Sequence, residues 1–318
     1  MEANGSLRLG CPVTYLHSCL RGAGQVMFQN SSWTGLLFLI GIFYGAYAEG
    51  QPLVAWGGAV ALLVSTITGY VLEQPSDEGE EGLWGFNGIL VGCGIMTFVG
   101  NTVGAWIAIV LCSALTVWVR RGFNNIMSPW GVSSFTFPFV FCTWIFLLCA
   151  RTMSALPSEY MSAVSLPTAE TAIVHPLDLP HLLVYWLKGV SQVFLINNWV
   201  SGVLFLIGLA LCSRWAAFWA AAGSGMALFI AIAYGAPSSD IANGLYGFSP
   251  VLTAIALGCT FYKPSWRSAL WCVLGTVTTV FIQGAMDVLF MPVGLPTLTA
   301  PFCIATWLFI FPKFKIGR

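Results

Sequence analysis

The sequence predicts an all-α polytopic membrane protein with ten transmembrane helices and two re-entrant half-helices in two inverted repeats. Three observations support this fold class: few charges, long apolar runs and repeated segments. Charged residues make up 8% of the 318 residues and apolar residues 58%, whereas soluble domains hold about 25% and about 45–50%. Runs such as residues 36–46 do not alternate apolar and polar residues, as the strands of a transmembrane barrel would.

Ten apolar segments bounded by turn residues are the predicted transmembrane helices. They cover residues 34–48, 52–71, 86–99, 102–119, 135–150, 201–212, 215–234, 248–261, 266–286 and 298–311. Several are shorter than the roughly 20 residues that a straight crossing needs, so we expect neighbouring protein to support them.

The basic residues predict the orientation. Ten crossings place both termini on one side, where ten of the twelve Lys and Arg residues fall, leaving Arg151 and Lys188 opposite. The positive-inside rule therefore predicts two cytoplasmic termini. The polar stretch 151–180 becomes an external linker between a first inverted repeat (1–150) and a second (181–318), each with a re-entrant helix and five spans.

Three pairs of segments repeat in the same order. Residues 25–41 (QVMFQNSSWTGLLFLIG) match 192–208 (QVFLINNWVSGVLFLIG) at nine of seventeen positions. Residues 82–90 match 244–252, and 136–146 match 299–309, at nearly the same offset. Because each half holds an odd number of predicted crossings, the second half is predicted to be inverted, an arrangement that places a solute pathway between the halves.

Two further blocks are too short and too polar to cross a membrane alone. Residues 16–30 are apolar but contain Arg21 and Gln25, and residues 182–197 are their counterpart. Half-length helices of this kind are tolerated where they line a cavity, so both blocks are predicted to be re-entrant helices.

Five segments resemble the urea transporter family: QVMFQNSSWTGLLFLIG, QVFLINNWVSGVLFLIG, GLWGFNGILVG, GLYGFSPVLTAIALG and LPTLTAPFCIATW. The resemblance covers nearly the whole chain. It implies a homotrimer in a lipid bilayer, in which each protomer encloses its own pore for the passive passage of urea.

The resemblance also implies which residues line that pore. Hydrogen-bonding groups would be the side chains of Gln25, Gln192, Thr136 and Thr299. Apolar walls would be formed by Phe28, Phe86, Phe248, Leu90, Leu252, Val26, Val193 and Leu195.

These residue types suit a planar, neutral and very polar solute. Urea has four N–H donors and one carbonyl, so a narrow pore must replace its hydration with acceptors along its edges. Glutamine and threonine offer such acceptors, and flat phenylalanine faces narrow the passage to a slot. The predicted spans hold no ionisable residue near their middle, which favours passive transport over ion coupling.

Other functions are less well supported. A channel for ammonia, water or short amides stays an alternative within transport. An enzyme would need an ionisable pair or metal ligands within the membrane, and the three histidines and ten cysteines lack metal-ligand spacing. We therefore expect no cofactor, no metal and no catalytic residue, and a net charge of zero excludes a nucleic-acid partner. The short termini favour a compact bacterial version in the inner membrane, with a mammalian plasma membrane left open.

Overall fold

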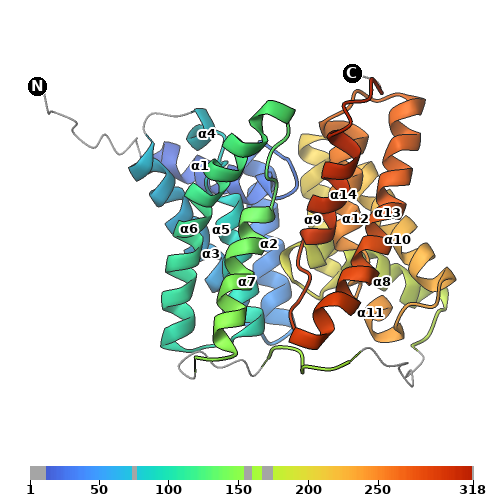
Figure 1. Ribbon diagram of the computed structural model, residues 1–318, viewed down its shortest axis with the longest axis horizontal. Helices are drawn as coiled ribbons and strands as arrows, with labels where there is room; N and C mark the ends of the chain where they lie inside the picture. Colours follow the sequence, from blue (N-terminus) through green and yellow to red (C-terminus); the bar gives the residue numbers. More distant parts are fainter. Residues whose placement is uncertain (1–11, 74–76, 154–159, 167–174, 317–318) are drawn as a thin grey trace, which may run out of the picture.

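The computed structural model describes residues 12–73, 77–153, 160–166 and 175–316, and the regular elements in these ranges are all helices (Figure 1). Two basic residues used for the orientation, Arg8 and Arg318, lie outside the described residues, as do residues 154–159 and 167–174 of the predicted linker. The C-terminal helix ends at the same end of the bundle as the start of the first helix, and the described linker residues run along the opposite end (Figure 1).

The two halves contain the same succession of helices. The first half is composed of α1 (Pro12–Gln25), α2 (Ser32–Ala48), α3 (Pro52–Leu72), α4 (Asp77–Glu80), α5 (Phe86–Phe98), α6 (Val103–Met127) and α7 (Phe137–Ala150). The second is composed of α8 (Leu179–Ser191), α9 (Trp199–Cys212), α10 (Arg214–Ala233), α11 (Ser238–Ala242), α12 (Phe248–Ile255), α13 (Trp266–Phe290) and α14 (Ala300–Ile310). Within the described residues, α1 lies near the end that carries the chain termini and α8 near the other end (Figure 1).

Four helices are long and apolar enough to cross a membrane: α3, α6 with the turn that follows it, α10, and α13 with the turn that follows it. Helices α8 and α9 pass the same test together and are bent by 71° at their break, which gives five candidate spans among the described residues if the pair is one span. The apolar helices α2, α5, α7, α12 and α14 are shorter. The chain is therefore a multi-pass helical membrane protein, and ten crossings stay a prediction.

Helix α6 continues beyond the end that the sequence predicts. The prediction ended at residue 119 because Arg120 and Arg121 interrupt the apolar run, but the helix continues to Met127. Both arginines form ion pairs: Arg120 with Glu78 at 2.9 Å and Arg121 with Glu73 at 2.8 Å. The acidic residues before α5 that the structure describes thus include the short helix α4 and two ion-pair partners, Glu73 and Glu78.

Polar side chains cap the N-termini of α2 and α9. The Ser31 side chain accepts a hydrogen bond from Thr34 N at the start of α2, and Asn198, its counterpart, accepts from Val200 N and Ser201 N at the start of α9. Such caps satisfy backbone donors that a helix leaves free in its first turn. They fix the sharp turn that follows each half-length helix, α1 and α8.

Glycines let each half-length helix approach a turn closely. A Cβ atom on Gly82 would collide with Gly22 N, and one on Gly244 would collide with Gly189 N. Both turn glycines have positive φ, 78° and 69°, which is strained for any other residue. The two close contacts are counterparts in the two halves. The same packing therefore holds α1 against the turn before α5 and α8 against the turn before α12.

Helices α2 and α9 are joined by a reciprocal pair of hydrogen bonds. Thr34 Oγ1 donates to Gly208 O at 2.8 Å, and Ser201 Oγ donates to Gly41 O at 2.7 Å. Each residue of the first bond is 167 positions from its counterpart in the second. Both bonds are buried, so the halves meet through equivalent contacts.

A second reciprocal pair joins the ends of the halves. Trp144 Nε1 donates to Pro296 O at 2.8 Å, and Trp307 Nε1 donates to Ser133 O at 3.0 Å. The counterparts are 163 positions apart. The same contact therefore occurs once in each direction between the halves, and the inverted relation of the halves stays a prediction.

Candidate functional site

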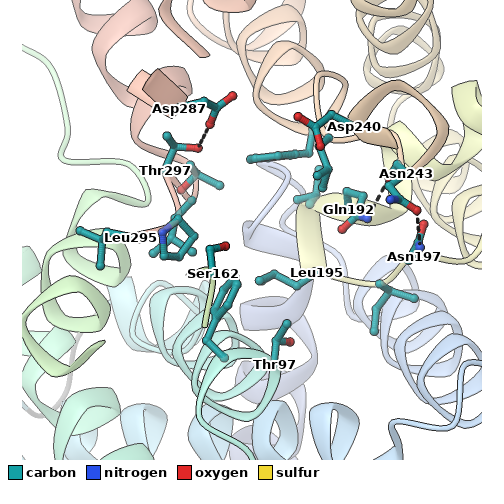
Figure 2. A pocket seen from close by; sticks show the side chains of 18 of the residues that line it. Thr97, Ser162, Gln192, Leu195, Asn197, Asp240, Asn243, Asp287, Leu295 and Thr297 are labelled. Atoms are coloured by element: carbon teal, nitrogen blue, oxygen red, sulfur yellow. Dashed lines mark hydrogen bonds between the residues drawn. The ribbon is translucent and has the colours of Figure 1, made fainter. Parts of the chain in front are cut away.

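A cavity of about 630 Å³ lies at the end of the bundle that carries the linker (Figure 2). Asp287 and Thr297 form one wall, and Asp240, Asn243, Gln192 and Asn197 line the opposite wall (Figure 2). Carbonyl, carboxylate and hydroxyl oxygens face the space, so the cavity is rich in hydrogen-bond acceptors.

Five of the twelve predicted pore residues line this cavity: Gln192, Val193, Leu195, Phe248 and Thr299. They come from the second half. The other seven, which are not among the residues that line it, are Gln25, Val26, Phe28, Phe86, Leu90, Thr136 and Leu252. Apart from Gln25 and Phe28, these seven side chains are buried. Whether each contacts a transported solute stays a prediction.

The two glutamines make equivalent hydrogen bonds. Gln25 Nε2 donates to Glu81 O at 3.0 Å, and Gln192 Nε2 donates to Asn243 O at 2.9 Å. Of the two polar atoms of a glutamine side chain, only the nitrogen can donate to a backbone carbonyl. Each bond therefore fixes which way the amide group points. The amide oxygen of each glutamine is left as an acceptor, which is the group that a solute with N–H donors needs.

The two predicted threonines meet each other between the halves. Thr136 Oγ1 and Thr299 Oγ1 are 2.6 Å apart, and Cys303 Sγ lies 3.4 Å from Thr136 Oγ1. Both threonines are buried, and Thr299 also lines the cavity. One hydroxyl donates to the other, so the pair keeps one proton and further lone pairs for other partners.

Left-handed backbone recurs at matched positions beside these groups. Phe28 and Leu195 have φ of 62° and 58°, and Phe135 and Leu298 both have φ of 51°. This conformation is less stable by roughly 1 kcal/mol or more for a residue other than glycine. The strain ends each half-length helix abruptly and turns the chain next to Gln25 and Gln192.

Aromatic rings fill the space around Phe28. Its ring centroid lies 6.2 Å from that of Phe135, 5.9 Å from Phe261 and 6.0 Å from Phe302, all edge to face. Phe28 and Phe135 belong to the first half of the chain, and Phe261 and Phe302 to the second. Rings packed in this way offer a hydrated ion no hydrogen-bond partner in place of its water.

Sequence reasoning missed the acidic residues of the cavity. Asp240 and Asp287 are not among the predicted pore residues, yet both line the cavity together with Glu49. Asp287 accepts from Gln283 Nε2 at 2.9 Å and from Thr297 Oγ1 at 3.2 Å. The offsets of the repeats, extended past the matched segments, would have paired these positions with the other half.

The linker also contributes to the site. Arg151 Nη2 donates to Ser162 O at 2.7 Å and to Gly294 O at 2.8 Å, and Met161 is buried in the core. Ser162 lies in the cavity (Figure 2). A linker predicted from its polarity alone gave no sign of this contact.

Arg120, one of the ten basic residues counted on the side of the termini, is a buried cation. It is 6% exposed, and its guanidinium carbon lies 5.3 Å from the ring centroid of Trp84 and 5.9 Å from that of Phe86. With the ion pair to Glu78, these contacts balance the loss of hydration.

Replacing Arg120 by methionine should destabilise the protein by about 1–3 kcal/mol, because the ion pair and both ring contacts disappear. Arg121→Met is the control, since Arg121 is 46% exposed and exposed pairs contribute about 0–1 kcal/mol. Thermal unfolding of the purified protein followed by tryptophan fluorescence measures both. Equal midpoints for the two variants would contradict the role assigned to Arg120.

Comparisons with known proteins match most of the chain. A family profile described as "UT: Urea transporter" matches residues 16–314. "Urea transporter 1" of Ovis aries is 29% identical over 296 residues, which cover 92% of this chain and 75% of the relative. "Urea transporter 1" of Rattus norvegicus is 30% identical with the same coverage.

Proposed function

This chain belongs to the urea transporter family, and we propose that it carries urea passively across a membrane through a narrow pore in each protomer. The observation that carries the proposal is the line of acceptors from the cavity to the threonine pair. Gln192 and Thr299 both line the cavity, and Thr299 contacts Thr136 across the two halves.

Urea enters from the linker side and exchanges water for protein acceptors. The cavity of about 630 Å³ has room for a hydrated solute, and the Gln192 amide oxygen accepts an N–H bond beside Phe248 and Leu195, which line the same cavity. The threonine hydroxyls accept the next N–H bonds. Weak bonds in succession let a solute enter and leave, as conduction requires.

The second part of the pathway uses the first-half counterparts. Beyond the threonine pair, the solute passes the ring of Phe28 and reaches the Gln25 amide oxygen, with Val26, Phe86 and Leu90 as apolar walls. Aromatic faces accept N–H contacts of about 0.5–1 kcal/mol, less than a hydrogen bond to an amide oxygen. The apolar walls exclude hydrated ions, which keeps the passage selective for a neutral solute.

The assembly and orientation complete the proposal. Three protomers form a homotrimer, both termini are cytoplasmic, the linker is external, and the host membrane is a bacterial inner membrane. The repeats, residues 1–150 and 181–318, act as the two halves of the pore around one pseudo-two-fold axis. The chemistry is transport without bond making, so the protein is not an enzyme.

Stopped-flow light scattering on proteoliposomes tests the function. We expect urea entry to be much faster than glycerol entry and faster than urea entry into empty liposomes. It should not change when a sodium or proton gradient is imposed, because no coupling site is proposed. Urea entry equal to that of empty liposomes would contradict urea transport, and entry driven by a gradient would contradict a passive mechanism.

A further inference from the structure

We propose that the linker-side cavity binds a planar guanidinium-type cation between Asp240, Asp287 and Gln283. The cation would occupy the position that the Arg120 guanidinium occupies in the first half. The first half therefore serves as the template for the second.

In the template, one guanidinium is held by three contacts. Arg120 pairs with Glu78 at 2.9 Å and lies over the rings of Trp84 and Phe86 at 5.3 and 5.9 Å. The carboxylate supplies charge, and the ring faces suit a flat, delocalised cation that is weakly hydrated.

The repeat offsets give the counterparts in the second half. Helices α6 and α13 have equal lengths, 25 residues, and start 163 positions apart. Arg120 therefore corresponds to Gln283. At the offset of 162, Glu78 corresponds to Asp240, and Phe86 to Phe248. The carboxylate and the ring are kept, while an amide replaces the guanidinium.

In the part of the chain that the structure describes, the side chain of Gln283 lacks a hydrogen-bond donor for its oxygen. It lines the cavity, is 3% exposed, and its Nε2 donates to Asp287 Oδ1 and to Thr297 Oγ1 at 2.7 Å. Its Oε1 has no hydrogen-bond partner among the described residues. A buried acceptor without a donor is costly, and a guanidinium N–H would supply that donor.

The charge of the cavity favours a cation. Glu49, Asp240 and Asp287 line it, and the described lining residues include no lysine, arginine or histidine. Asp240 and Asp287 lie on opposite sides of the space (Figure 2). Asn124, the counterpart of Asp287 in the first half, is neutral, so the second half carries one more carboxylate for a cation.

A planar organic cation fits better than a metal ion. The described residues contain no group of three or more His, Cys, Asp or Glu side chains close enough to hold a metal. Phe248 supplies an aromatic face, and the acceptors are spread around the cavity, as a cation with several N–H donors requires. One consequence rests on the proposed function: because Gln192 and Thr299 line the same space, the bound cation competes with urea.

Isothermal titration calorimetry of the purified full-length protein with methylguanidinium chloride, at constant ionic strength, tests the proposal without any flux assay. We expect binding by the wild type and none with tetramethylammonium chloride, which lacks N–H donors. Asp287→Asn should weaken binding about ten-fold or more, because it removes a charged hydrogen bond. Gln283→Arg should abolish binding, because the new side chain would occupy the site as Arg120 does.

Asp178→Asn is the matched control, since Asp178 is an exposed carboxylate on the linker side that does not line the cavity. It should bind as the wild type does. Absence of methylguanidinium binding in the wild type, or equal affinity in the wild type and Gln283→Arg, would overturn the site. If Asp287→Asn does not elute as a folded protein, Gln283→Arg decides the result. Urea flux without methylguanidinium binding would refute this site alone, and binding without urea flux would refute the proposed function alone.

Discussion

We expect Thr299→Val to lower urea flux in proteoliposomes by about ten- to a hundred-fold, while the protein remains folded. Valine keeps the shape of threonine but removes the hydroxyl that lies 2.6 Å from Thr136 Oγ1. A urea N–H group that reaches this buried position then has no acceptor, which costs about 1–3 kcal/mol at the narrow part of the pathway. The remaining Thr136 hydroxyl also loses its strong partner, so Thr136 alone does not restore the acceptor pair.

Thr276→Val is the control for loss of a buried hydroxyl. Thr276 is buried, donates to Cys272 O within its own helix at 2.8 Å, and does not line the cavity. We expect this variant to keep urea flux within about two-fold of the wild type, because its bond within one helix contributes only a small free energy of folding. Similar flux for Thr299→Val and the wild type would remove the threonine pair from the proposed pathway.

The helices could be predicted because the membrane makes apolar length and turn residues strong signals. Segment 52–71 became α3, Pro52–Leu72, nearly residue for residue. The end of α6 was predicted too early for one reason. Arg120 ends the apolar run, but its charge is paired with Glu78, which lies 42 positions away in the sequence. A pairing between distant side chains leaves no trace in local hydropathy, so the extension of the helix could not be predicted.

The candidate site could be predicted where residues repeat, and not where the halves differ. Gln25 and Gln192 are identical, and the structure gives them the same hydrogen bond to counterpart carbonyls. Gln283 differs from Arg120, and a search for identities passes over such a position. Ser162 reaches the cavity through the fold of the linker, which depends on tertiary contacts such as the bond from Arg151. Differences between equivalent positions, as much as identities, indicate where two halves have separate roles.

The close approach of α8 to the turn before α12 makes Gly244 the position where one methyl group should do most damage to stability. Gly244 has φ of 69°, and an added Cβ would collide with Gly189 N and lie 2.7 Å from Lys188 C. These are backbone atoms, so a rotamer change cannot relieve the contact. Gly244→Ala must push α8 away, and Gln192, which follows α8 and donates to Asn243 O, would move with it.

Gly235→Ala separates the two causes of this effect. Gly235 has nearly the same φ, 67°, but its added Cβ would have no atom within 4 Å. Gly235→Ala therefore loses only roughly 1–2 kcal/mol of stability through its backbone conformation. Gly244→Ala loses about 1–3 kcal/mol more through overpacking. We expect the thermal midpoint of Gly244→Ala to be about 2–5 °C below that of Gly235→Ala, with urea flux reduced in Gly244→Ala alone. Equal midpoints and equal flux would show that α8 and the turn do not need this contact, and that the position of Gln192 is set by other parts of the fold.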